Sequence, residues 1–123
     1  MSMAKKKTNF RSWIMSKLRS ASYKWPARNE ALVAARVERG RYKCAMCGGI
    51  FSRDEVQIDH INPVVGLDGF TTWDDIIARM FPEAEGFQIL DINCHDAKTA
   101  AEDAMRAYYN KEKKLVDKKK EKE

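Results

Sequence analysis

The chain has 123 residues, 33% of them charged, and a formal net charge of +5 at pH 7. This length suits one domain, since domains usually contain about 100–150 residues. No apolar run approaches the roughly 18 residues of a membrane span, and no apolar signal segment follows the first lysines, so we expect a soluble, cytoplasmic protein with no membrane partner. Three cysteines are an odd number, and the close pair Cys44 and Cys47 favours metal binding over a structural disulfide.

The net charge is unevenly distributed along the chain. Residues 1–43 carry 12 basic and 2 acidic side chains, residues 44–95 carry 2 and 9, and residues 96–123 carry 9 and 7. Basic segments neutralise phosphates and attract nucleic acid, while clustered carboxylates suit a divalent metal ion. The alternative is that the lysines only keep the chain in solution.

Two helices are predicted before the cysteines. Residues 1–8 form a basic arm that we expect to be disordered, and residues 9–40 form a helical extension. Pro26 suits the first turn of the second helix, and Gly40 is a C-terminal stop. The end of this helix would present Arg36, Arg39 and Arg41 just ahead of the cysteines. The first helix, from Thr8 or Asn9 to about residues 20–23, has one apolar stripe made of Phe10, Trp13, Ile14 and Leu18.

From Tyr42 onward the pattern changes to short strands and turns. Residues 44–49 predict a tight turn, and Val56 to Asp59 alternate as in a half-buried strand, which we interpret as part of a β-hairpin opening into a site. Thr71 caps a helix that ends at Pro82. A last helix begins near Cys94 and becomes polar all round, and residues 111–123 form a charged tail that we expect to fray.

Two pairs of candidate zinc ligands are spaced three residues apart. Cys44 and Cys47 lie in the predicted turn, and Asp91 and Cys94 lie at the start of the last helix. A tetrahedral zinc site needs four ligands, and two such turns supply them. A carboxylate in place of one thiolate gives an acceptable but weaker site, because zinc is borderline-soft. The alternative is a set of free thiols beside a solvated aspartate.

A second candidate site uses both histidines of the chain. Asp59 and His60 end the predicted strand, and His95 follows Cys94. A carboxylate and one imidazole can hold an ion such as Mg²⁺ or Mn²⁺, while a second imidazole takes a proton from water. The spacing alone is weak, because isolated histidines are more often structural than catalytic.

Three segments in order carry a family resemblance: residues 42–49, residues 56–63 with Asp59-His60-Ile-Asn-Pro63, and residues 87–99 with Cys94-His95-Asp-Ala-Lys98-Thr99. Together they resemble the motif of HNH endonucleases, in particular small HNH proteins encoded by bacteriophages, over roughly residues 41–100. The resemblance implies an α+β fold with a ββα-metal core and zinc-knuckle-like turns, preceded by two N-terminal helices and followed by a C-terminal helix. Residues 41–110 would be the nuclease domain.

The resemblance also implies roles for these residues. His60 corresponds to the general base, and Asp59 and His95 correspond to ligands of one catalytic divalent ion, Mg²⁺ or Mn²⁺, with Ni²⁺ as a further candidate. The substrate would be double-stranded DNA in the cytoplasm of a bacterial host, cut with low sequence specificity to leave 5′-phosphate and 3′-hydroxyl ends. The zinc would be structural. The residues expected to bind nucleic acid are Lys5, Lys6, Lys7, Arg11, Arg36, Arg39, Arg41 and Lys98.

Two positions depart from the family pattern. Gly86 stands where an asparagine usually tethers the loop of the catalytic histidine, with Asn62 and Asn93 as possible substitutes, and Asp91 stands where a third zinc cysteine is usual. They motivate a rival function, a catalytically weak or inactive zinc-knuckle module that binds DNA or a partner protein. A third reading is an adaptor that acts through its C-terminal helix.

Overall fold

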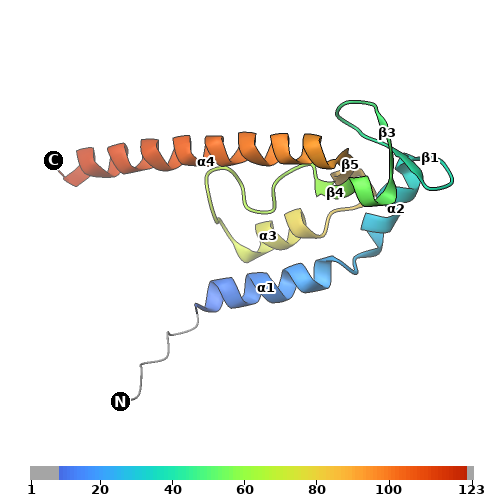
Figure 1. Cartoon of the computed structure of the whole chain (residues 1–123). Coiled ribbons are helices and arrows are strands. Elements are labelled where there is room, and N and C mark those ends of the chain that lie inside the picture. The colour runs from blue at the N-terminus through green and yellow to red at the C-terminus, as the bar shows by residue number, and fades with distance from the viewer. Residues whose placement is uncertain (1–8, 122–123) are drawn as a thin grey trace, which may run out of the picture.

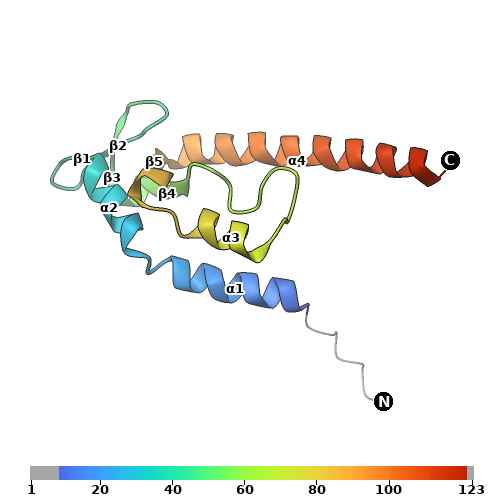
Figure 2. The ribbon, with the colours of Figure 1, turned by 180° about the vertical axis from the view of Figure 1, so that it is seen from behind.

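The computed structural model describes residues 9–121, which form an α+β fold of four α-helices and two small antiparallel sheets (Figure 1). The predicted α+β class is thereby confirmed. In Figures 1 and 2 the helix α3 (Trp73–Met80) lies between α1 (Phe10–Ser22) and the long α4 (Ile92–Glu121), and the strands gather at one end. The basic arm at residues 1–8, with Lys5, Lys6 and Lys7, lies outside the described residues.

The helix α1 begins where the sequence predicts. Asn9 caps it, and the Asn9 side chain accepts a hydrogen bond from the backbone N–H of Ser12 at 3.3 Å. The side chains of Met15 and Leu18 pack against α3 and against the loop that precedes α3, which carries Val64. Only part of the predicted stripe is covered, because Phe10 and Trp13 remain 69% and 49% exposed.

The second helix is shorter than predicted. The helix α2 (Pro26–Ala35) stops at Ala35, and the next residues form the strand β1 (Arg36–Glu38), antiparallel to β2 (Arg41–Lys43). Gly40 lies in the turn between these strands at φ +72°, a conformation that favours glycine. The prediction that a helix carries Arg36 was wrong, because pairing with β2 overrides the local helical preference.

The remaining short strands form two pairs. The strand β3 (Ile50–Ser52) pairs with β2 and completes a three-stranded sheet around the turn at residues 44–49. A 3₁₀ turn (Arg53–Glu55) then leads into β4 (Val56–His60). The partner of β4 is β5 (Phe87–Asp91), so the strand that ends in His60 is not part of a local hairpin. The register sets His60 opposite Phe87 and Asp59 opposite Gln88.

The strand β5 leads directly into α4, with no intervening loop. A 3₁₀ turn (Ala84–Gly86) precedes β5. The helix α3 is capped by Thr72, one residue after the predicted Thr71. The hydroxyl of Thr71 instead donates a hydrogen bond to the Asp75 carboxylate at 2.6 Å. The helix α4 continues through residues 111–121, the segment predicted as a charged tail, and the side chains of 111–120 are exposed there. No helix between residues 10 and 121 has the length and apolarity needed to cross a membrane.

Three small groups of buried side chains make up the core. One joins α2 to β5 and another joins α2 to both β4 and β5, so the two-stranded sheet is held against α2. The third joins α3 to the loop before it, and α1 packs on this group. Burial of apolar surface therefore holds the pair of strands β4 and β5 against α2, and β4 ends at the candidate catalytic residues. The buried members are Ala27, Ala31 and Phe87; Leu32, Val56 and Ile89; and Val64, Ile76 and Met80.

Candidate metal centre and active site

Cys44, Cys47, Asp91 and Cys94 converge, as the sequence predicts, and one ligand atom from each lies within 4.8 Å of the others. The first two come from the turn after β2, which is closed by a hydrogen bond from Gly48 N–H to the Cys44 carbonyl at 3.0 Å. Asp91 ends β5 and Cys94 lies in the first turn of α4. The four residues are close enough to bind one metal ion, in an arrangement compatible with a zinc knuckle.

Asp91 is the centre of this cluster. Its side chain is buried, accepting hydrogen bonds from the backbone N–H of Cys94 at 3.0 Å and from the thiol of Cys47 at 3.1 Å. The Cys94 N–H and then the Cys47 thiol hold the pKa of the Asp91 carboxyl well below its usual range. The same carboxylate raises the pKa of the Cys94 thiol to about 12. An incoming metal would thus meet an ionised carboxylate and displace protons from the thiols.

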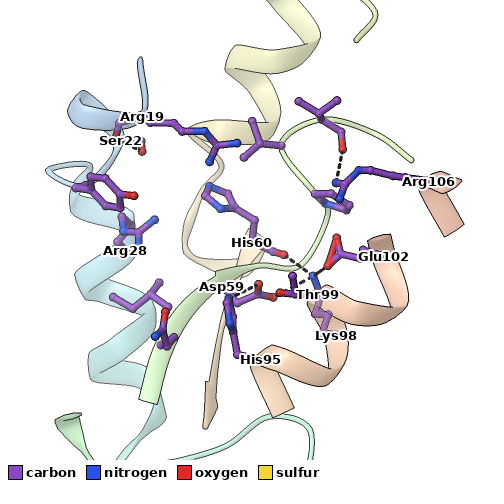
Figure 3. A pocket seen from close by; sticks show the side chains of 16 residues that line it. Arg19, Ser22, Arg28, Asp59, His60, His95, Lys98, Thr99, Glu102 and Arg106 are labelled. Carbon is purple, nitrogen blue, oxygen red and sulfur yellow. Dashed lines mark hydrogen bonds and ion pairs between the residues drawn. The ribbon is translucent and has the colours of Figure 1, made fainter. Parts of the chain in front are cut away.

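The second candidate site is a cavity of about 540 Å³ beside the end of β4 (Figure 3). Asp59 and His60 enter it from β4, and His95 enters it from the first turn of α4. The structure therefore brings together the three residues that the sequence assigns to catalysis. They are separate from the cysteine cluster, although Cys94 and His95 are adjacent in the chain.

The two carboxylate oxygens of Asp59 face different partners. Oδ2 accepts a hydrogen bond from Gln88 Nε2 at 2.9 Å and lies 3.2 Å from Lys98 Nζ. Oδ1 lies 3.8 Å from His95 Nε2. With metal–ligand bonds of about 2.1 Å, two ligand atoms of one ion lie up to about 4.2 Å apart. Asp59 and His95 are therefore a chemically suitable pair of ligands for a divalent cation, with water and substrate as its other ligands.

His60 is held through one ring nitrogen. Its Nε2 lies 2.9 Å from the backbone carbonyl of Met80, and because a carbonyl only accepts, Nε2 must carry the proton. The ring also packs on Phe87, with centroids 4.8 Å apart. Burial lowers the pKa of His60, and this effect outweighs the opposing one of the Met80 carbonyl. The neutral ring then has its lone pair on Nδ1, where a base needs it.

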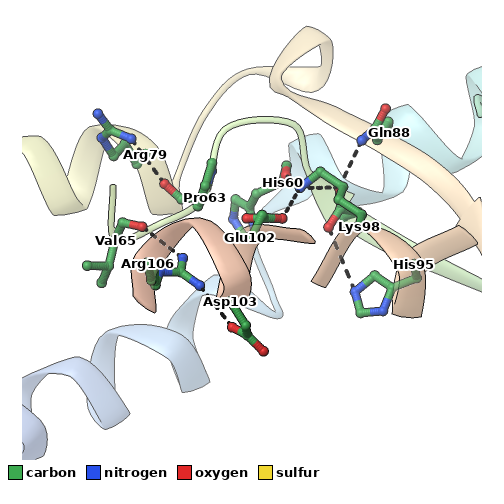
Figure 4. Close-up of polar contacts among 11 residues, drawn as sticks. His60, Pro63, Val65, Arg79, Gln88, His95, Lys98, Glu102, Asp103 and Arg106 are labelled. Carbon is green, nitrogen blue, oxygen red and sulfur yellow. Dashed lines mark hydrogen bonds and ion pairs between the residues drawn. The ribbon is translucent and has the colours of Figure 1, made fainter. Parts of the chain in front are cut away.

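Lys98, predicted to meet a phosphate, is occupied by protein groups. Its Nζ donates to the His60 carbonyl at 3.1 Å and to Glu102 at 2.6 Å, and Figure 4 shows it between these residues. The side chain is 16% exposed. Burial opposes its charge, but Glu102 and Asp59 raise the pKa of Lys98. Its charge is offset by the carboxylates of Asp59 and Glu102.

Gly86, in the place of the usual asparagine, has no room for a side chain. A Cβ atom on Gly86 would lie 2.5 Å from Pro82 Cβ. Instead, the Gly86 carbonyl accepts a hydrogen bond from Ile61 N–H at 3.0 Å, directly after His60. Asn62 and Asn93, the possible substitutes, are exposed. The segment that carries His60 is therefore tied by main-chain atoms.

The arginines predicted to bind nucleic acid lie outside the cavity. Arg36, Arg39 and Arg41 are exposed on β1, β2 and their connecting turn, and the Arg11 guanidinium lies over the Phe70 ring at 4.0 Å. Sequence reasoning missed Gln88, which becomes recognisable once the pairing of β4 with β5 is known. It also missed four charged residues of the cavity wall, which come from three different helices: Arg19, Arg28, Glu102 and Arg106.

Compared with known proteins, the chain matches no family model, no curated protein and no solved structure. The chemistry of the cavity follows from its side chains. A carboxylate and an imidazole face each other at a distance that one cation can bridge, and a second imidazole, that of His60, lies at the same strand end as the carboxylate. Together they can activate water next to an anionic substrate.

Proposed function

We propose that the protein is a divalent-metal-dependent DNA endonuclease of the HNH type, with low sequence specificity. The observation that carries this proposal is His60, tied by Nε2–H to the Met80 carbonyl, in one cavity with the facing pair Asp59 and His95. The antiparallel pair β4 and β5, which α3 separates in the chain, leads into α4 and supports the proposal as a candidate ββα core.

In this proposal Asp59 and His95 would hold the catalytic cation. The cation, Mg²⁺ or Mn²⁺, would supply Lewis-acid stabilisation of the charge on the scissile phosphate and the leaving oxygen. Gln88 and Lys98 hold the other Asp59 oxygen, so the carboxylate presents Oδ1 in a fixed direction.

His60 acts as the general base. Its Nδ1 takes a proton from water, the water oxygen bonds to phosphorus, and the bond from phosphorus to the 3′ oxygen breaks. The 3′ oxygen leaves with a proton from solvent, which gives 5′-phosphate and 3′-hydroxyl ends. The Nε2–H bond to the Met80 carbonyl keeps the ring oriented in both protonation states.

The cysteine cluster has a structural role in this proposal. Three thiolates and one carboxylate suit zinc, and they suit Mg²⁺ poorly. A zinc ion there would join the turn after β2 to the first turn of α4. Because His95 directly follows Cys94, the ion would also fix the backbone that presents His95.

A plasmid assay tests the nuclease proposal. Supercoiled plasmid is incubated with Mg²⁺, Mn²⁺, Ni²⁺ or EDTA, using wild type, His60→Ala, and Asn62→Ala as a nearby exposed control. We expect nicking or cutting only with a divalent cation, and a loss of about 10²–10⁴-fold in His60→Ala alone, as for removal of a general base. Equal rates for His60→Ala and wild type would contradict the assignment.

One observation favours the rival function, a zinc module that binds DNA without cutting it. The cysteine cluster brings four ligands together, whereas the cavity brings only Asp59 and His95 face to face. Zinc-loaded protein that binds duplex DNA but leaves plasmid intact with each of the three cations would support this second function.

A further inference from the structure

The cavity around His60 has two walls with different electrostatic character (Figure 3). On the α4 wall each cation already has protein partners: Lys98 pairs with two carboxylates, and Arg106 donates to the Val65 carbonyl at 3.0 Å and to Asp103 at 3.3 Å. The opposite wall comes from α1 and α2 and contributes Arg19 and Arg28.

The guanidinium groups of Arg19 and Arg28 have no carboxylate partner among the described side chains of residues 9–120. Arg28 is half-buried, with its guanidinium 5.4 Å from the Phe87 ring centroid and 5.2 Å from that of Tyr23. Burial, and then repulsion from Arg53, lower the pKa of Arg28, while Tyr23 opposes this. Partial burial without an acidic partner is energetically unfavourable for Arg28, and an anion bound at its guanidinium would offset this cost.

The composition of the lining also favours an anion. Four cations, Arg19, Arg28, Lys98 and Arg106, face this cavity together with two carboxylates, Asp59 and Glu102. The planar guanidinium fork matches two oxygens of a phosphate, and an aromatic ring beneath it restricts its orientation. The last turn of α1, which carries Arg19, is fixed by a hydrogen bond from Ser22 Oγ to the Arg19 carbonyl at 2.7 Å.

We propose that Arg19 and Arg28 form a binding subsite for a backbone phosphate of the DNA, across His60 from the α4 wall. This inference rests on the proposed function and extends it. The subsite holds a phosphate neighbouring the one that is cut, so the cut strand crosses the cavity from the α1–α2 side to the α4 side. The two N-terminal helices are then part of the substrate-binding surface.

The test measures DNA binding separately from cleavage. In a His60→Ala background, fluorescence anisotropy of a labelled duplex is followed over a range of salt concentrations, without a chelator. The variant Arg19→Gln/Arg28→Gln is compared with Lys113→Gln/Lys118→Gln, which removes two exposed charges from the far part of α4. Each lost phosphate contact reduces the slope of log K against log salt by about 0.9. We expect a reduction of about 1–2 for the arginine pair and an unchanged slope for the lysine pair.

A second measurement uses proteins that retain His60 and follows the rate of plasmid nicking at limiting DNA. We expect the arginine pair to lower the rate about tenfold or more, as for the loss of charge-assisted hydrogen bonds. Arg28→Lys retains the charge without the fork, so its salt slope stays near wild type while nicking falls. Thermal melts of each variant establish that it is folded.

The outcomes separate this inference from the nuclease proposal. If wild type nicks DNA and the arginine pair changes neither the slope nor the rate, the phosphate subsite is wrong and the nuclease proposal stands. If the arginine pair lowers the slope but wild type does not nick, the subsite is supported and the nuclease proposal is wrong.

Discussion

The imidazole of His60 donates from Nε2 to the main-chain carbonyl of Met80 over 2.9 Å. Met80 is the last residue of α3 and is fully buried. The hydrogen bond therefore connects the end of β4 to the end of α3 and assigns the proton to Nε2. Because burial partly removes the ring from water, the charge state of His60 also affects stability.

The first prediction concerns the pH dependence of stability. Burial lowers the pKa of His60 in the folded chain below the ordinary value of 6.5, so the unfolded chain binds this proton more tightly. The contribution of neutral His60 is complete above about pH 6.5 and decreases as the pH falls. We expect the free energy of urea unfolding to fall more steeply from pH 7 to pH 5 in wild type than in His60→Gln, whose amide can still donate to Met80. Parallel curves for the two proteins would show that His60 is not desolvated.

The second prediction concerns Gln88, which positions the metal-facing carboxylate. Gln88→Leu removes the 2.9 Å hydrogen bond to Asp59 Oδ2 but retains a side chain of similar size. We expect nicking to fall about 10–100-fold and the Mg²⁺ concentration for half-maximal rate to rise, as for other groups that orient a metal ligand. Asn110→Leu, which replaces an exposed amide on α4 outside the cavity lining, is the control and should leave the metal dependence unchanged. A lower rate with unchanged metal dependence in Gln88→Leu would argue against a positioning role.

The third prediction tests the core under α3 with two neighbouring isoleucines. Ile76 is 0% exposed and Ile77 is 43% exposed on the same helix. Ile76→Ala leaves a cavity among Val64 and Met80 and should cost about 2–5 kcal/mol of unfolding free energy. Ile77→Ala should cost less than about 1 kcal/mol, because little burial is lost. Similar losses in both variants, measured by urea unfolding, would mean that α3 packs differently.

Local sequence signals account for much of the fold. Asn9 at the start of α1 and Pro26 at the start of α2 mark helix beginnings that depend on neighbouring residues only. The end of α2 and the strand β5 were missed, because both depend on pairing with other segments. The residues 36–38 are a strand only because β2 pairs with them, and β5 finds its partner across α3.

In the candidate site, too, the sequence indicates some groups and not others. The two ligand pairs around Cys44 and Cys94 and the residues Asp59, His60 and His95 have reactive side chains in recognisable spacings. The groups that hold them are partly main-chain atoms, such as the carbonyls of Met80 and Gly86. Every residue has such a carbonyl, so no residue type indicates which one will meet His60.

The cysteine cluster supports the last prediction, in which Asp91 has two separable roles. Its Oδ1 accepts the Cys94 N–H at the start of α4, a helix-capping contact that needs only an oxygen acceptor. Its Oδ2 faces the Cys47 thiol, where a charged ligand would complete a metal site. Asparagine retains the first role and lacks the charge for the second, whereas cysteine supplies a thiolate ligand but no carboxylate cap.

We therefore expect Asp91→Cys to bind zinc more tightly than wild type and to melt at a higher temperature in the presence of zinc, because a ligand that binds only the folded state stabilises it. Asp91→Asn should bind zinc more weakly, yet its metal-free melting temperature should remain close to that of wild type. Asp117→Asn, at an exposed position far along the same helix, controls for lost charge. Elemental analysis of protein purified without chelator, with melts before and after EDTA, measures both effects. Only a trace of zinc in wild type and in Asp91→Cys would show that packing alone holds the cluster together.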